Sequence, residues 1–247
     1  MKIYLNLKFC NIRILNIINL FKLEHDPHAS IGLLANYDSL ELYNRNNINQ
    51  KSIKVDFCSK KNNYRCLNFT KKNEILYKVS GIKKSYIPFI LDLTAGLGND
   101  SFIFSFLGCR VLMIERHPVI AALLTDGLQR AYQNTKIGDW IKKRLHLIAT
   151  DSINILESSI FKPDIIYLDP MYPISKNKSL PKKNMQILRV LIGHHSDDYE
   201  KILYMSRKLA KNRVIIKRPA YAKAISQNKI NFFINTKHHR FDIYRPF

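Results

Sequence analysis

A turn between a strand and a helix carries the first side chains that could do chemistry. The segment Leu91–Asp100 reads LDLTAGLGND, and it follows a compact apolar run and precedes a stretch with helical spacing. Gly96 and Gly98 let the backbone turn sharply and approach a ligand without Cβ clashes. Asp92 and Asp100 place carboxylates beside the same turn. Ligands of open α/β sheets bind in this kind of strand-to-helix crevice, so the segment predicts a ligand-binding loop.

An acid after the next strand narrows the class of ligand. Glu115 ends the apolar run Arg110–Glu115 and is suited to accept hydrogen bonds from both hydroxyls of a ribose. This much fits a nicotinamide dinucleotide and S-adenosylmethionine equally well. A dinucleotide fingerprint requires a third glycine where this sequence has Ser101. Carboxylates beside the turn suit a sulfonium and an amino group better than a pyrophosphate, so S-adenosylmethionine is the favoured cofactor.

A second motif follows a later apolar strand and supplies an acceptor for an amine. The segment Ile165–Pro173 delivers Asp169, Pro170, Met171 and Tyr172 to the carboxyl edge of the expected sheet. It resembles the Asp/Asn-Pro-Pro-Tyr box of amino-methyltransferases, with Met in the third place. The Asp169 carboxylate and the Pro170 carbonyl can accept the two N–H bonds of a nucleobase amine, which localises its lone pair toward a methyl donor. Tyr172 offers a ring on which a displaced base can stack.

Basic side chains are expected at the mouth of this site. They follow the Asp-Pro motif or end the fifth strand on the same edge, and they are Lys176, Lys178, Lys182, Lys183, Lys217 and Arg218. Clustered cations are what binding of a phosphate backbone requires. The 247-residue chain carries 40 Lys and Arg against 19 Asp and Glu, a net charge of +21, which favours a nucleic acid as partner. Part of this excess reflects the Lys-, Asn- and Ile-rich composition of the whole sequence.

Composition also excludes several classes of protein. With 46% hydrophobic and 11% aromatic residues the chain can build a core, so global disorder is excluded. The four cysteines form no CxxC pair, and the paired histidines at 194–195 and 238–239 have no partner at ligand spacing, so no metal site is expected. The apolar N-terminus is interrupted by polar residues and lacks a signal-peptide cleavage site, and no stretch has the length of a membrane span. We therefore expect a cytoplasmic protein without membrane contact.

The elements that position these motifs change character near residue 80. Residues 1–80 contain short apolar runs and are predicted to form a small mixed or β-rich region, with a strand at Ser52–Phe57 and a short helix at Asn73–Ser80. Residues 81–247 alternate apolar strands with helices, which indicates an α/β domain with a doubly wound, mostly parallel sheet. The predicted strands are Pro88–Leu93, Arg110–Glu115, Leu145–Ala149, Asp164–Leu168 and Arg213–Lys217, with a closing hairpin at Asn231–Asn235 and Arg240–Tyr244. The predicted helices are Asp100–Leu107, Pro118–Tyr132 and Asp198–Ala210.

Taken together, the motifs resemble the ribosomal small subunit methyltransferase J family. The matching stretches are Leu23–Asp26, Val55–Phe57, Leu91–Asp100, Gly108–Val111, Glu115–Arg116, Pro118–Val119, Ala121–Gly127, Tyr167–Met171, Val214–Pro219 and His239–Tyr244. The resemblance covers nearly the whole chain. It implies a Rossmann-like class I methyltransferase fold and methylation of the exocyclic N2 amine of a guanine in small-subunit (16S) ribosomal RNA.

The resemblance also assigns the cofactor contacts. They fall on Asn99, Asp100, Glu115, Arg116, Asp151, Ser152 and Asp169. Three other hypotheses stay open at this point: an adenine-N6 nucleic-acid methyltransferase, a nicotinamide-dependent dehydrogenase, and a non-catalytic RNA-binding protein. The substrate RNA could be free or part of a partly assembled subunit.

Overall fold

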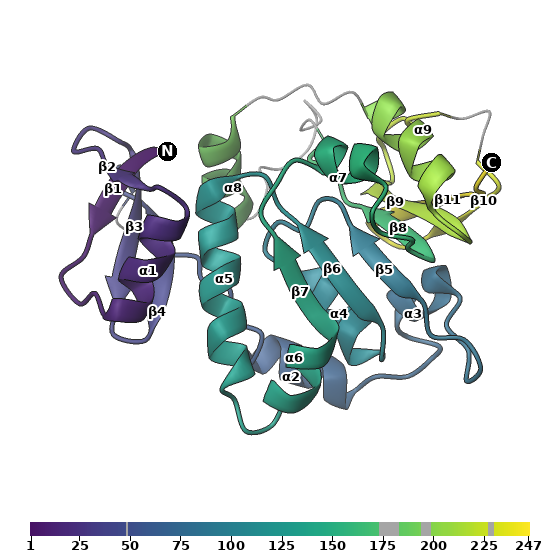
Figure 1. Ribbon diagram of the computed structural model, residues 1–247, viewed down its shortest axis with the longest axis horizontal. Coiled ribbons are helices and arrows are strands. Elements are labelled where there is room, and N and C mark those ends of the chain that lie inside the picture. Colours follow the sequence, from purple (N-terminus) through teal and green to yellow (C-terminus); the bar gives the residue numbers. More distant parts are fainter. Residues whose placement is uncertain (48, 173–182, 194–198, 227–229) are drawn as a thin grey trace.

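A seven-stranded sheet forms the larger part of the molecule (Figure 1). The structure is a computed structural model, and it describes residues 1–47, 49–172, 183–193, 199–226 and 230–247. The strand order is β10-β11-β9-β8-β5-β6-β7. The strands are β5 (Phe89–Asp92), β6 (Arg110–Ile114), β7 (Leu145–Ile148), β8 (Ile165–Leu168), β9 (Arg213–Pro219), β10 (Phe232–Asn235) and β11 (His239–Tyr244). Neighbours from β7 to β9 are parallel and β11 is antiparallel to both β9 and β10, which confirms the predicted doubly wound sheet and its closing hairpin.

Both faces of this sheet are covered by helices. The helices of this part are α3 (Ile75–Ser80), α4 (Asn99–Phe106), α5 (Pro118–Tyr132), α6 (Gly138–Arg144), α7 (Ser152–Ser158), α8 (Lys183–Ile192) and α9 (Tyr199–Leu209). Strand side chains alternate between two cores: Ile90 and Met113 pack in the core that contains α4, α5 and α6, whereas Leu91 and Leu112 pack in the core that contains α7 and α9. This alternation is why the strands are apolar at almost every position. Among the described residues, no helix is both long and apolar enough to cross a membrane.

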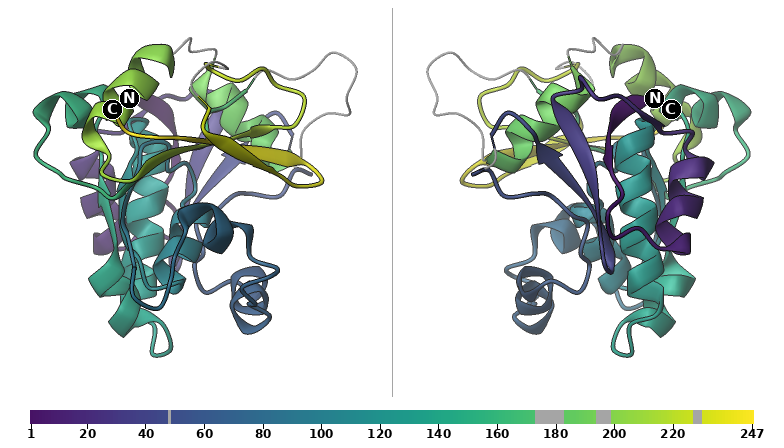
Figure 2. Two further views of the ribbon diagram at one scale, coloured as in Figure 1. Left: turned by 90° about the vertical axis from the view of Figure 1, so that its right-hand side faces the viewer. Right: turned by 90° about the vertical axis from the view of Figure 1, so that its left-hand side faces the viewer.

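A smaller sheet near the N-terminus packs on the outer side of α5 (Figures 1 and 2). Its strands are β1 (Lys2–Asn6), β2 (Glu24–His25), β3 (Ile31–Asn36) and β4 (Ser39–Asn44), in the order β2-β1-β3-β4. The β1 strand is parallel to β2 and β3, whereas β3 and β4 are antiparallel. Helix α1 (Ile12–Leu20) also contacts α5. The region is therefore mixed, as predicted.

One local prediction for residues 1–80 is wrong, and one helix was not predicted. Ser52–Phe57 is not a strand: within it, only Ile53 forms a β-bridge, to Leu42. Residues Lys60–Leu67, which have no apolar stripe, form helix α2, and its N-cap Ser59 accepts a hydrogen bond from the Asn62 N–H.

The predicted helix that ends at Gly81 is present as α3. The predicted division at residue 80 stays a prediction. One hydrophobic core runs across it, because Phe57 and Leu76 belong to the same cluster as Met113 and Leu124.

Candidate active site

The loop between β5 and α4 is shaped by its two glycines in different ways. Gly96 has φ +53° and open space where a Cβ would stand, so the backbone faces the cavity without a side chain. Gly98 has φ +72° and is the N-cap of α4. A Cβ at Gly98 would meet Leu124 and Phe57 at 3.0 and 3.1 Å. Gly98 therefore fixes the start of the helix against the core, and it does not line the cavity as predicted.

Asp92 stabilises this loop through two hydrogen bonds that its carboxylate accepts. The Thr94 N–H donates to Asp92 Oδ1 at 3.1 Å, and the Ser101 hydroxyl donates to Asp92 Oδ2 at 2.5 Å. The side chain is buried, and burial raises the pKa of Asp92 to about 7 although both hydrogen bonds lower it. Asp92 lines the cavity, as predicted, and also stabilises the turn.

The tips of β5 and β8 are tied together directly. The Asp169 N–H donates to Thr94 Oγ1 at 2.6 Å, and the Leu93 N–H donates to the Tyr167 carbonyl at 3.0 Å. The glycine turn and Asp169 thus open onto one cavity of about 510 Å³. Had the two motifs faced separate surfaces, no group could pass between them.

Lys217 joins two carboxylates at the centre of this cavity. Its Nζ lies 2.7 Å from Asp100 Oδ2 and 2.7 Å from Asp169 Oδ2. The Tyr167 hydroxyl donates to Asp100 Oδ2 at 2.7 Å. Lys217 was expected to contact phosphate at the entrance, but its charge is committed to Asp100 and Asp169 and its side chain is only 17% exposed.

The pKa values of Asp100 and Asp169 shift in opposite directions, although both carboxylates are bonded to Lys217. Burial opposes ionisation of Asp100, but the charge and hydrogen bond of Lys217 and the hydroxyl of Tyr167 outweigh it, so the pKa of Asp100 is lowered. Desolvation dominates at Asp169, and it raises the pKa of that carboxyl to about 6 despite Lys217. Although burial opposes its charge, the two carboxylates raise the pKa of Lys217, which therefore stays cationic. Of the two carboxylates that share Lys217, Asp169 is therefore the one whose charge changes closer to neutral pH.

Glu115 directly follows β6 and lines the same cavity. Its Oε2 accepts the Gly96 N–H at 3.0 Å and its Oε1 accepts the His117 N–H at 2.8 Å. Burial raises the pKa of Glu115, while these backbone hydrogen bonds lower it. The carboxylate is therefore held in place beside the glycine turn, where it retains lone pairs for hydroxyl donors.

The residues predicted beyond β6 and β7 divide between the cavity and a helix cap. Arg116 and Ser152 line the cavity. Asp151 does not: it is the N-cap of α7, and its Oδ1 accepts the Ile153 N–H at 2.8 Å. Arg116 Nη1 lies 3.7 Å from Asp151 Oδ2, so Asp151 orients a residue that does face the cavity.

The loop after β8 presents Pro170, Met171 and Tyr172 to the cavity. The Tyr172 hydroxyl is buried and has no hydrogen-bond partner in the described part of the chain, and burial raises its pKa. Its carbonyl accepts a hydrogen bond from Arg189 of α8 at 2.5 Å. The loop is thus held by α8 while a polar aromatic side chain faces the cavity unsatisfied.

The predicted basic entrance is only partly described. Lys176, Lys178 and Lys182 lie outside the described residues, as does the side chain of Lys183, the first residue of α8. Arg218 is buried and pairs with Asp242 of β11 at 2.6 Å. Successive side chains of a strand point to opposite faces, so Arg218 points away from the cavity that Lys217 lines. The prediction that Lys217 and Arg218 lie together at one entrance is therefore wrong.

Several cavity residues were missed by sequence reasoning. They are Thr94, Tyr167, Arg189 and His239. Strand alternation could have found Tyr167, because it is two residues from Asp169 and so shares its face. Among the described residues, no group of three or more His, Cys, Asp or Glu side chains could hold a metal ion.

Comparison with known proteins agrees with this geometry. Residues 16–246 match the family model described as "Putative SAM-dependent methyltransferase". Over all 247 residues, and over the full length of the relative, the chain is 65% identical to ribosomal RNA small subunit methyltransferase J of Buchnera aphidicola subsp. Acyrthosiphon pisum (strain APS). It is 44% identical to the protein of that name from Photorhabdus laumondii, with 90% of each chain covered.

A crystal structure supports the same assignment. A SAM-dependent methyltransferase from Neisseria gonorrhoeae superposes with a TM-score of 0.76 at 29% identity, covering 100% of this chain and 96% of that one. The glycine turn, the Asp169 loop and these matches over the full length lead to one conclusion. The chain belongs to the ribosomal RNA small subunit methyltransferase J family and is an S-adenosylmethionine-dependent methyltransferase.

Proposed function

We propose that the protein transfers a methyl group from S-adenosylmethionine to the exocyclic N2 amine of a guanine in small-subunit ribosomal RNA. The observation that carries the proposal is the position of Asp169. Its backbone is bonded to the donor loop through Thr94, and its carboxylate faces the cavity beside Lys217. The names of the relatives above supply the RNA class, and the Asp-Pro motif supplies the amine.

The residues that line the cavity fit the methyl donor. Asp92, Asp100, Glu115 and Asp169 bring four carboxyl groups to a cavity of about 510 Å³, which suits a cationic sulfonium and an amino group. Glu115 stands where a ribose can donate its hydroxyls. The open side of Gly96 leaves room for a ligand against the backbone. When bound there, the cofactor supplies an electrophilic methyl group.

The chain's own residues prepare the amine. The lone pair of a nucleobase amine is delocalised into the ring, and it becomes available when both N–H bonds are accepted by protein oxygens. We assign this acceptance to the Asp169 carboxylate and the Pro170 carbonyl, since both residues line the cavity. Tyr172 offers an aromatic face to the base and a buried hydroxyl that needs a partner. Most of the acceleration then comes from aligning nitrogen with the methyl carbon.

A direct assay identifies the nucleic acid and the base that receive the methyl group. Tritiated S-adenosylmethionine is incubated with unmethylated small-subunit ribosomal RNA, with partly assembled subunits, and with duplex DNA, and the labelled base is identified. We expect label in guanine of the RNA. Label in adenine of DNA, or none in any substrate, contradicts the proposal.

Asp169→Ala is expected to lower transfer by about 10²-fold or more, because the amine loses its charged acceptor. Binding of S-adenosylmethionine should weaken only partly, as measured by titration calorimetry. Asp139→Asn, an exposed acid on α6, is the control and should leave both quantities unchanged. Turnover retained by the Asp169 variant would refute the assigned role.

We place the reaction in the cytoplasm. All four cysteines are free thiols in the structure, which fits a reducing compartment. Fractionation of cells that produce the protein checks this placement.

A further inference from the structure

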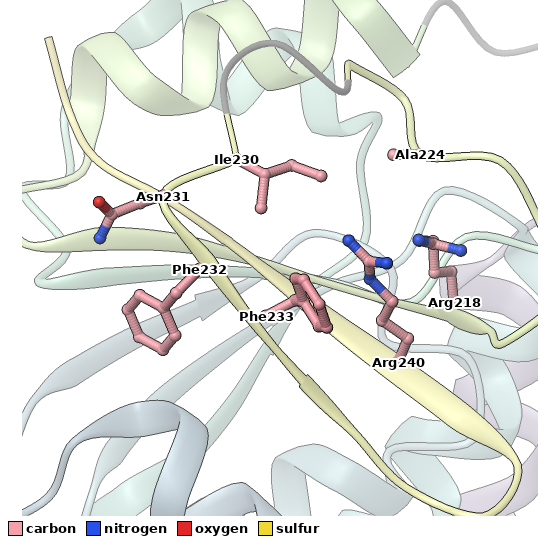
Figure 3. A pocket seen from close by; sticks show the side chains of 7 residues that line it. All are labelled: Arg218, Ala224, Ile230, Asn231, Phe232, Phe233 and Arg240. Carbon is pink, nitrogen blue, oxygen red and sulfur yellow. The ribbon is translucent and has the colours of Figure 1, made fainter.

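A second cavity, of about 600 Å³, is lined by residues of β9, β10 and β11 and of the segment that precedes β10 (Figure 3). Arg218, Arg240, Phe233 and Ile230 are among its lining residues. None of these residues lines the cavity around Asp169.

The two cavities are nevertheless neighbours through the backbone. Lys217 and His239 line the first cavity, and the next residue of each strand, Arg218 and Arg240, lines the second. The alternation of side chains along β9 and β11 thus divides one sheet edge between two sites. A ligand in the second cavity would therefore contact residues that directly follow residues of the first.

Among the described residues of the second cavity, the arginines outnumber their carboxylate partner. Arg218 and Arg240 are directly opposite each other in the β9–β11 ladder, an arrangement that is unfavourable for two like charges. Asp242 lies between them: Arg218 Nε is 2.6 Å from Asp242 Oδ2, and Arg240 Nε is 2.6 Å from Asp242 Oδ1. Two guanidinium groups therefore share one buried carboxylate, and one positive charge is left over.

Hydrogen-bond donors remain for an anion. Arg218 Nη1 is used by the carbonyls of Pro219 and Ala222. Within the described chain, the terminal nitrogens of Arg240 have no hydrogen-bond partner, and its side chain is 24% exposed. Figure 3 shows the guanidinium ends of Arg218 and Arg240 side by side. This is the geometry in which an oxyanion accepts several charge-assisted hydrogen bonds.

Aromatic side chains stand beside these donors. The Arg240 guanidinium carbon lies 3.7 Å from the centre of the Phe233 ring. Phe232 and Phe233 are both exposed, at 41% and 48%. Planar cations stacked on exposed rings form platforms for nucleobases, which stack on any π face.

We infer that this second cavity binds a phosphate of the substrate RNA, with a neighbouring base stacked on the Phe233–Arg240 pair. The inference rests on the proposed RNA substrate. It identifies a contact away from the reacting base that holds the strand while the target guanine enters the cavity of Asp169. A phosphate would balance the surplus positive charge of the two arginines, and an RNA strand would provide bases that stack on the phenylalanine rings.

The test uses the whole protein and a labelled fragment of unmethylated small-subunit ribosomal RNA. Arg240→Gln removes the surplus charge and leaves Arg218 paired one-to-one with Asp242. We expect the Kd for RNA to rise about threefold to tenfold, and the slope of log K against log salt to decrease by about 0.7, the value for one phosphate contact on a single strand. Affinity for S-adenosylmethionine and kcat at saturating RNA should not change.

Arg110→Gln is the matched control. Arg110 is an exposed arginine on β6 that lies 5.6 Å from the ring of Phe89. The substitution therefore removes an arginine beside a phenylalanine ring, but from another part of the sheet. It should shift the Kd for RNA by less than twofold. An equal loss of affinity in both variants would show a general charge effect and overturn the inference.

Phe233→Ala gives a second, independent readout. It should raise the Kd for RNA about fivefold or more through lost stacking, with an unchanged salt slope, since no charge is removed. It decides the question if Arg240→Gln lowers the Tm. RNA affinity and salt slope that match the wild type in both variants overturn the inference. The proposed function fails differently: wild-type protein then transfers no methyl group to the RNA.

Discussion

At the scale of single residues, the site depends on how one cation serves two acids. Lys217 is bonded equally to Asp100 and Asp169, yet the pKa values of these carboxyls move in opposite directions. The difference follows from their other partners. Asp100 also accepts the Tyr167 hydroxyl, whereas Asp169 accepts only Lys217 among the described side chains. Asp169 is thus left with accepting capacity for a substrate.

Lys217→Met tests this sharing through pH dependence. In the proposed mechanism transfer requires ionised Asp169, so kcat/KM of the wild type should fall as pH drops through about 6. A nearby cation lowers a carboxyl pKa, so its removal raises the pKa of Asp169 and moves this acid limb to higher pH. The pH profile of kcat/KM measures the shift.

Lys211 is an exposed lysine that precedes the first residue of β9. Lys211→Met is the control and should not change the pH profile of kcat/KM. Identical profiles for the Lys217 variant and the wild type would exclude the proposed electrostatic role.

At the scale of elements, Gly98 couples the start of α4 to the core. Gly98→Ala meets two costs, a left-handed backbone at φ +72° and Cβ contacts of 3.0 to 3.2 Å with Leu124, Phe57 and Met113. We expect a loss of about 1–3 kcal/mol in unfolding free energy and weaker binding of S-adenosylmethionine, since Asn99 and Asp100 begin this helix.

Gly193→Ala separates the two costs. Gly193 also has a left-handed backbone, at φ +70°, but nothing lies within 4 Å of an added Cβ. It should lose only the backbone part, about 1 kcal/mol by thermal unfolding, and retain cofactor affinity. Equal losses at both glycines would show that packing beneath α4 is unimportant.

The larger sheet could be predicted because its parallel strands, β5 to β9, are apolar runs that end in polar or glycine-containing turns. The elements of residues 1–80 could be predicted only in part. Ser52–Phe57 alternates like a strand, but Val55 packs against Gly127 of α5 and Phe57 stacks on Phe102 of α4. Helices bury the apolar side chains of this segment. The alternation of polar and apolar residues therefore reflects burial and does not require hydrogen bonds to a neighbouring strand. Lys217 shows the same limit at the site: its neighbours in space are 48 and 117 residues away in sequence.

At the scale of the whole molecule, a buried carboxylate joins the small sheet to the rest. Asp126 of α5 is fully buried and accepts hydrogen bonds from Arg13 of α1, from Arg130, and from the Leu40 N–H of β4. Asp126→Asn leaves both arginines without their counterion, and we expect a loss of about 2–4 kcal/mol in unfolding free energy. Urea unfolding followed by Trp140 fluorescence and far-UV circular dichroism measures it.

The two probes should report a single transition, because one core spans both sheets. Glu157→Gln, which removes an exposed ion pair with Lys201, is the control and should cost less than about 0.5 kcal/mol. Separate transitions in the wild type would show that the small sheet unfolds on its own.

The Asp100–Lys217–Asp169 cluster has a consequence for the end of the reaction. Two anions and one cation sum to a single negative charge, which a bound sulfonium neutralises. In the proposed transfer the cofactor would give up its methyl group and its charge, and the methylated amine would have to lose one proton. Asp169, with a pKa of about 6, is the stronger base of the two carboxylates and can receive that proton and release it to water at neutral pH. In this proposal, the carboxylate that balances the charge of the cofactor would also accept the proton that the amine releases.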